Sequence, residues 1–135
     1  MLHAMTSGHD GSLTTVHASG PRVALHRLEA LALLSDAKLA PQVLRQMVGS
    51  GVDLIIHLAS YHRPGGPVRR VSGMAFVDQN LEDALWMPMV QEFCRYRRSS
   101  DDWEWEQGFI ASAPRKVLEK LETAGLDPWK LRSAE

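Results

Sequence analysis

The sequence predicts an α/β fold, because helix-type and strand-type patterns alternate along its first half. Apolar residues recur at helical spacing over residues 21–34 and again from residue 41. Residues 52–59 (VDLIIHLA) form a short, almost wholly apolar run, which is typical of a strand buried on both faces. Residues 68–77 have the composition of a returning strand, and the Pro-Gly-Gly-Pro turn between the two runs predicts a β-hairpin.

Both helices of the first half have a clear start. Pro21 and Pro41 each suit the first turn of a helix, where the missing N–H costs nothing, and Ser19 or Gly20 can cap the first. We expect the second helix to end at Gly49-Ser50-Gly51, where a glycine can adopt a positive φ.

A polar stretch precedes these helices. Residues 1–7 are expected to form a short helix or a disordered arm, and residues 12–18 a strand. Alternation along that strand would place Thr15 and His17 on the same face.

The second half predicts a smaller hairpin followed by a helix. We expect a helical turn over residues 80–86, strands over 89–98 and 103–106, and a helix over 114–124 that ends at Gly125. The side chains of Trp103 and Trp105 are expected to pack on Phe93 or on that helix, and Trp129 on the body of the protein. We interpret His57, inside the apolar run, as a residue of the core or of the strand ladder.

Composition narrows the classes of function. A chain of 135 residues with 44% hydrophobic and 23% charged residues is typical of one folded domain. A net charge of −1 gives no field that would attract nucleic acid, and the acidic residues around Trp103 and Trp105 cancel the basic strand beside them. The single Cys94 excludes an internal disulfide, and no apolar run reaches the length of a membrane-spanning helix, so no direct membrane insertion is expected.

One motif is more specific than the rest. Residues 8–18 read GHDGSLTTVHA, and they are followed by SGPR and then by RLE at residues 27–29. This order resembles the His box of the type II/IV secretion ATPases, most closely the CpaF/TadA-like branch of tight-adherence pilus motors. The resemblance runs from residue 1 to about residue 60 and more loosely to the C-terminus.

The resemblance implies a fold and a site. Residues 1–78 would be the C-terminal part of a RecA-like P-loop NTPase domain, and residues 79–135 a C-terminal extension. His17 would sense the γ-phosphate of ATP and act with His9 in catalysis, while Thr15, Arg22 and Arg27 would contact phosphate. The implied cofactors are ATP and Mg²⁺. The implied partners are the other subunits of a hexamer and the membrane platform of a secretion or pilus system, at the cytoplasmic face of the membrane.

Residue chemistry alone leaves plainer alternatives open. His9 and His17 could be hydrogen-bonded residues of a buried strand, and Arg22 and Arg27 could make ordinary ion pairs on a helix surface. A metal site is less favoured, because no Cys or carboxylate stands at zinc-like spacing from the two histidines.

The sequence lacks the P-loop motif of this class of ATPase. No Gly-Lys-Ser or Gly-Lys-Thr occurs in the sequence, so the Lys and backbone cradle that bind phosphates in P-loop enzymes are absent. We therefore expect a piece that begins inside a motor domain and does not hydrolyse ATP alone. The alternatives are a non-catalytic module that docks on an intact secretion ATPase, or a remnant whose half-sheet leaves one edge unpaired and apolar surface bare.

Overall fold

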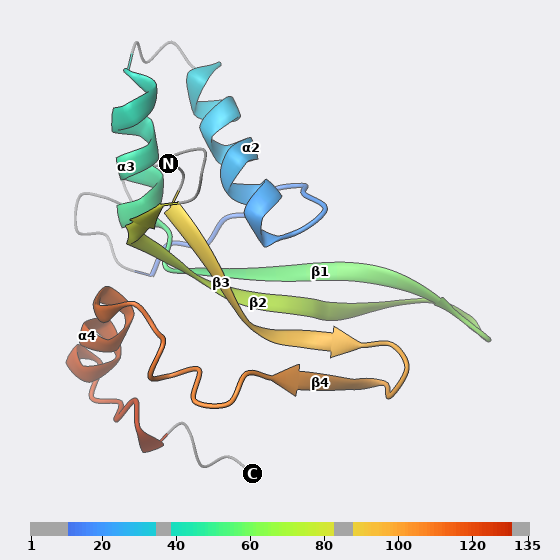
Figure 1. The fold of residues 1–135 in the computed structure, drawn as a ribbon. Coiled ribbons are helices and arrows are strands. Elements are labelled where there is room, and N and C mark those ends of the chain that lie inside the picture. The colour runs from blue at the N-terminus through green and yellow to red at the C-terminus, as the bar shows by residue number, and fades with distance from the viewer. Residues whose placement is uncertain (1–10, 35–38, 83–87, 131–135) are drawn as a thin grey trace.

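Four strands and three helices make up the described structure. The computed structural model describes residues 11–34, 39–82 and 88–130. In order, the elements are α2 (Pro21–Leu33), α3 (Pro41–Gly51), β1 (Leu54–Arg63), β2 (Gly66–Glu82), β3 (Pro88–Arg97), β4 (Asp102–Trp105) and α4 (Arg115–Thr123). The strands form one antiparallel sheet in the order β1-β2-β3-β4 (Figure 1), so the α/β class is confirmed.

Helices lie on both sides of this sheet (Figure 1). On one face α2 and α3 enclose a core cluster of Leu25, Leu28, Val48, Val52 and Val77. On the other face, α4 and the loop before it pack on a second cluster, formed by Phe76, Phe93, Cys94 and Ala113. Neighbouring residues of β2 therefore supply the two cores, as the alternation of side chains along a strand requires.

The two predicted hairpins are both present. A turn at Pro64 and Gly65 joins β1 to β2, and Gly65 and Gly66 have φ values of 104° and 116°, which side-chain-bearing residues rarely adopt. The second hairpin pairs β3 with β4, and the Trp105 ring lies 6.2 Å from that of Phe93. Helix α4 is followed by Gly125 at φ 75°, as expected of its C-terminal glycine.

The prediction that the apolar run is buried on both faces was wrong. Exposure alternates along β1, and Leu54, Ile56 and Leu58 are 44%, 50% and 64% exposed. The reason is position, because β1 is the first strand of the sheet: Ile55 packs on the core cluster under α2 and α3, whereas the cluster on the other face includes no residue of β1.

Two local predictions about elements were also wrong. Residues 12–18 have no regular secondary structure, because no strand pairs with them within the described residues. Residues 80–82 continue β2 instead of starting a helical turn, because the strand still has β3 to pair with, Glu82 standing opposite Pro88. Residues 83–86 of the predicted turn lie outside the described residues.

The glycine-rich end of α3 serves packing instead of a turn. The helix runs through Gly51, and neither Gly49 nor Gly51 has a positive φ. A Cβ added at Gly49 would lie 2.8 Å from Cγ of Pro88, so glycine at position 49 lets the start of β3 approach the helix.

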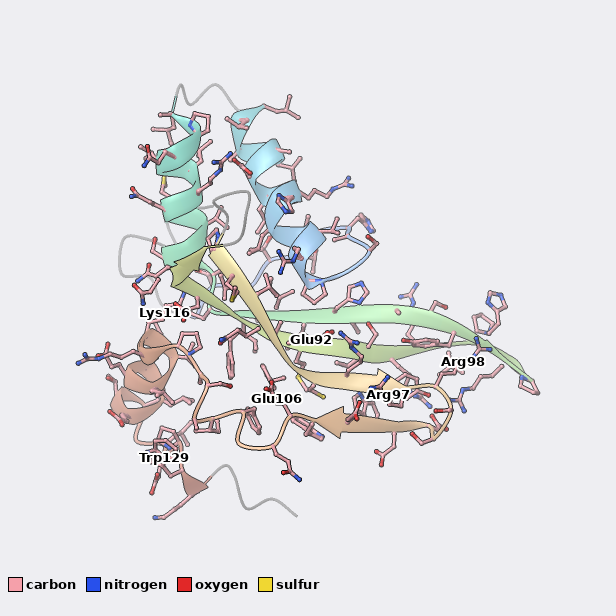
Figure 2. All side chains as sticks on the ribbon, in the orientation of Figure 1. Glu92, Arg97, Arg98, Glu106, Lys116 and Trp129 are labelled. Atoms are coloured by element: carbon pink, nitrogen blue, oxygen red, sulfur yellow. The ribbon has the colours of Figure 1, made fainter. Side chains whose placement is uncertain are left out.

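Two further expectations concern Trp129 and the boundary between domains. Trp129 is 55% exposed instead of packed on the body, because it lies beyond the end of α4 (Figure 2). The predicted division after residue 78 falls inside β2, and it stays a prediction.

Candidate functional site

The stretch of residues 11–18, called here the His segment, leads directly into α2. Thr15 and His17 are exposed, whereas Val16 and Ala18 are partly buried. Exposure therefore alternates over residues 15–18, as the sequence pattern predicts for an extended chain, although no strand forms.

A cavity separates the His segment from the edge strand β1. Its volume is about 340 Å³, and its walls are residues 12–18 on one side and 54–58 on the other, with Ala24, Leu28 and Val52 behind. A neighbouring hollow of about 790 Å³ is lined by residues 11–15, by exposed Leu54, Ile56 and Leu58, and by Lys120. The His segment and β1 thus lie on opposite sides of this space, and no backbone hydrogen bonds between them are found among the described residues.

His57 ties the two walls together at one end. Its Nε2 lies 3.2 Å from the carbonyl oxygen of Ala18, and its Nδ1 lies 2.5 Å from Oγ of Ser72. The Ser72 hydroxyl is also 3.1 Å from the carbonyl oxygen of His57. The cavity is therefore closed where the His segment meets α2.

The structure brings together only some of the predicted site residues. Thr15 and His17 both line the cavity between the His segment and β1. Arg22 and Arg27 are exposed on α2 and are not among the described residues that line it. His9 lies outside the described residues. The arrangement offers a hydroxyl and an imidazole to a ligand held against the β1 edge, which are groups able to bind a phosphate oxygen or a water.

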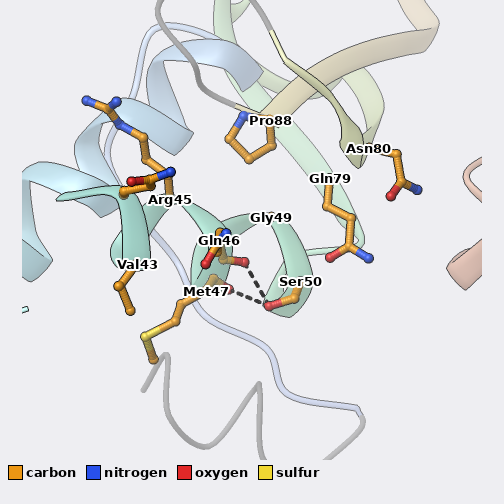
Figure 3. Close-up of a pocket in the computed structure, with 10 residues that line it drawn as sticks. Val43, Arg45, Gln46, Met47, Gly49, Ser50, Gln79, Asn80 and Pro88 are labelled. Atoms are coloured by element: carbon orange, nitrogen blue, oxygen red, sulfur yellow. Dashed lines mark hydrogen bonds between the residues drawn. The ribbon is translucent and has the colours of Figure 1, made fainter. Parts of the chain in front are cut away.

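A second cavity lies away from these residues. It has a volume of about 690 Å³ and opens between α3, the end of β2 and Pro88 (Figure 3). Amide side chains line much of it, and Arg45, the cation among its described lining residues, is paired with Glu29 at 2.8 Å. Neutral amides with a neutralised cation are a poor match for ATP phosphates.

Two further observations concern metal ions and membrane-spanning helices. In residues 11–34, 39–82 and 88–130, no group of three His, Cys, Asp or Glu side chains is placed to hold a metal ion. No helix of the same residues has the length and apolar character needed to cross a membrane.

Sequence reasoning missed the roles of His57 and Lys116. A histidine inside an apolar run needs partners for both ring nitrogens, and that requirement was the available signal. Lys116, on α4, gave no sequence signal. Its Nζ donates to the carbonyl oxygens of Gly49 at 2.6 Å and Val52 at 2.7 Å, which joins α4 to the end of α3 (Figure 2).

Comparison with known proteins gives one partial similarity to report. No protein-family model matches the sequence. Over 58 residues the chain is 36% identical to the conjugal transfer protein TrbB of Rhizobium radiobacter. The match covers 43% of this chain but only 17% of that protein, so the chain spans less than a fifth of its relative. The similarity is to a protein of conjugal transfer, and both the secretion ATPase family and its tight-adherence pilus branch stay predictions.

Proposed function

We propose that this chain is part of a type II/IV secretion ATPase and supplies the segment that faces the γ-phosphate of ATP. The observation that carries the proposal is the position of Thr15 and His17, which line a cavity against a strand edge that is unpaired among the described residues. The partial similarity to a conjugal transfer protein supports the same assignment.

The chemistry asked of these residues is modest. Phosphoryl transfer requires a positioned water and neutralisation of the charge that develops on the γ-phosphate. His17 would contact that phosphate, and Thr15 would hold the water or an oxygen bound to Mg²⁺. His9, Arg22 and Arg27 remain proposed contacts, the two arginines reaching either phosphate or a neighbouring subunit of a hexamer.

The phosphate cradle has to come from elsewhere, since the 135 residues contain no P-loop motif. The cavity beside β1 supports a way to complete the site. A P-loop-bearing segment would pair with the edge of β1 that is unpaired among the described residues, and would pack on the face of β1 that exposes Leu54, Ile56 and Leu58 in the chain alone. In this proposal the assembled motor works at the cytoplasmic face of a membrane platform.

The test is reconstitution. The chain is mixed or co-expressed with the P-loop-bearing part of a secretion ATPase, and phosphate release is measured with ATP and Mg²⁺. We expect no turnover from the chain alone and turnover from the complex. His17→Ala in the complex should lower kcat by about 10²–10³-fold, the usual cost of removing a group that stabilises transition-state charge.

His62→Ala is the matched control, because His62 is an exposed histidine of the same strand β1 and is not among the described residues that line the cavity. Turnover by the chain alone would contradict the proposal. So would a fully active complex carrying His17→Ala.

A non-catalytic docking module is the second candidate. The exposed apolar side chains on the β1 edge favour it, because they suit a protein partner whether or not ATP is hydrolysed. The reconstitution separates the two functions. A stable complex in which the chain adds no turnover, and in which His17→Ala has no effect, supports the docking module.

A further inference from the structure

We propose that His57 is a positioning residue that fixes the His segment against the sheet and thereby sets the direction of His17. The significance of this anchor for phosphate binding rests on the proposed function, but the anchor itself is a property of the chain. It follows from the contacts of one imidazole ring with two distant parts of the sequence.

The hydrogen bonds determine the state of the ring. A carbonyl oxygen only accepts, so the contact of 3.2 Å to Ala18 requires a proton on Nε2 of His57. In the neutral ring Nδ1 then carries no proton, and it accepts from the Ser72 hydroxyl at 2.5 Å. The geometry therefore assigns the Nε2–H tautomer to neutral His57.

The Ser72 hydroxyl keeps this arrangement intact when the ring becomes charged. Its oxygen also lies 3.1 Å from the carbonyl oxygen of His57, so its single proton can turn to that carbonyl. The hydroxyl oxygen would then accept from the newly protonated Nδ1. In both states Nε2–H is left to bind Ala18, so the anchor does not depend on the charge of His57.

The anchor matters because of where it acts on this stretch. Within residues 13–18 as described, the Ala18 carbonyl is the group that is hydrogen-bonded to the sheet. On the C-terminal side of Ala18 the chain enters α2 at Pro21, and this helix packs on the core through Leu25 and Leu28. A bond at Ala18 thus immobilises the peptide next to His17, while residues 12–16 border the open cavity.

Two amide variants distinguish the contribution of Nε2 from that of Nδ1. The amide nitrogen of His57→Gln reaches about as far as Nε2 and can still donate to Ala18, whereas that of His57→Asn reaches only about as far as Nδ1. His62→Gln, on the same strand but exposed, is the matched control. The readouts are ¹⁵N spectra of the imidazole in the unaltered chain and ¹H–¹⁵N relaxation of residues 13–18.

We expect the Nε2–H tautomer for His57 in the unaltered chain. We also expect His57→Asn to lower the order parameters of residues 15–18 to below about 0.6, the range of flexible backbone. His57→Gln should retain most of the order and His62→Gln all of it. An Nδ1–H tautomer would overturn the inference, as would equal order in the Gln and Asn variants.

These measurements use the chain without nucleotide or partner, so their failure would leave the proposed ATPase role untouched. Conversely, a reconstituted complex without turnover would not alter the tautomer or the relaxation result. The tautomer is read from the unaltered chain, so the inference stays testable even where a His57 variant fails to fold.

Discussion

At the residue scale, Lys116 shows how one cation can join two elements. Its side chain is only 16% exposed, and besides its two carbonyl partners it lies 3.3 Å from the Asp53 carboxylate. Burial lowers the pKa of Lys116, while Asp53 opposes that shift. The ammonium thus satisfies carbonyl groups at the end of α3 that the helix itself leaves without donors.

Replacing Lys116 with Met should destabilise the fold by about 1–3 kcal/mol, because a side chain of similar length remains but the buried carbonyls lose their donor. The measurement is the free energy of unfolding in urea at neutral pH. Arg115→Met is the control, since Arg115 is 88% exposed and pairs with Glu119 within the same helix. We expect it to cost less than about 0.5 kcal/mol, and equal losses would contradict the role of Lys116.

A second polar cluster closes the opposite end of the sheet. Asp101, in the β3–β4 turn, accepts from the Tyr96 hydroxyl at 2.5 Å and from both terminal nitrogens of Arg63 at 2.6 and 2.7 Å. The bond from Tyr96, followed by those from Arg63, lowers the pKa of Asp101. The ionised carboxylate therefore contributes stability above its ordinary pKa of about 4, and the contribution is lost as pH falls through the lowered value.

Asp101→Asn should remove this contribution without straining the turn. The native φ of 56° is left-handed, and asparagine tolerates it as well as aspartate does. We expect the variant to have a lower urea midpoint than the unaltered chain at pH 7, and the gap to narrow as pH falls from about 4 towards 2. Exposed Glu106→Gln serves as the control, and a gap that is constant with pH would refute the assignment.

At the element scale, β1 is a strand with one face packed and the other exposed. Its inner face is covered by α2 and α3, because Ile55 packs against their core cluster, but the opposite face is bare at three apolar positions. Natural edge strands usually carry charge or proline where they are exposed. An apolar face on an edge strand is therefore a surface that we expect to be covered, by a partner protein or by a second copy of the chain.

Ile56→Lys tests this expectation. Because Ile56 is 50% exposed, the lysine can point into solvent, and the free energy of unfolding should change by less than about 0.5 kcal/mol. Association through the edge should weaken at least about tenfold, since a charge would be buried without a partner. Sedimentation equilibrium measures self-association, and titration with the P-loop-bearing partner measures complex formation.

Val23→Lys is the matched control, because Val23 is 46% exposed on α2 and is not among the described residues that line the two cavities beside β1. The element-scale interpretation would be wrong if both substitutions reduced association equally, or if neither did.

At the scale of the whole molecule, β2 links the two cores. Val77 belongs to the cluster under α2 and α3, and its neighbour Phe76 stacks on Phe93 at 4.3 Å in the cluster under α4. Loss of either cluster would expose one face of β2. The two layers should therefore unfold together.

We expect helix content, followed by circular dichroism at 222 nm, and tryptophan fluorescence to report one coincident urea transition. The helical signal comes largely from α2 and α3, whereas Trp103 and Trp105, two of the four tryptophans, report on β4 at the far edge of the sheet. Replacing Trp86 and Trp129 with Phe restricts the fluorescence to this strand. Two separated midpoints would show that the layers are independent units.

The sequence predicted the parts of this fold that depend on short-range patterns. The helices starting at Pro21 and Pro41, the hairpin at Gly65, and the tryptophan hairpin follow from periodicity and turn chemistry, which act between residues close in the chain. The alternating exposure of residues 15–18 also agrees with the sequence pattern, and the missing P-loop could be read directly from the residues.

Only the tertiary structure decided what these elements face. An apolar run looks the same in a central strand and an edge strand, so the exposure of β1 could not be predicted from residues 54–58. Residues 12–18 carry a strand pattern, but a strand forms only when a neighbour supplies its hydrogen bonds. Likewise, the bond from His57 to Ala18 joins residues 39 positions apart, and no local pattern encodes such a contact.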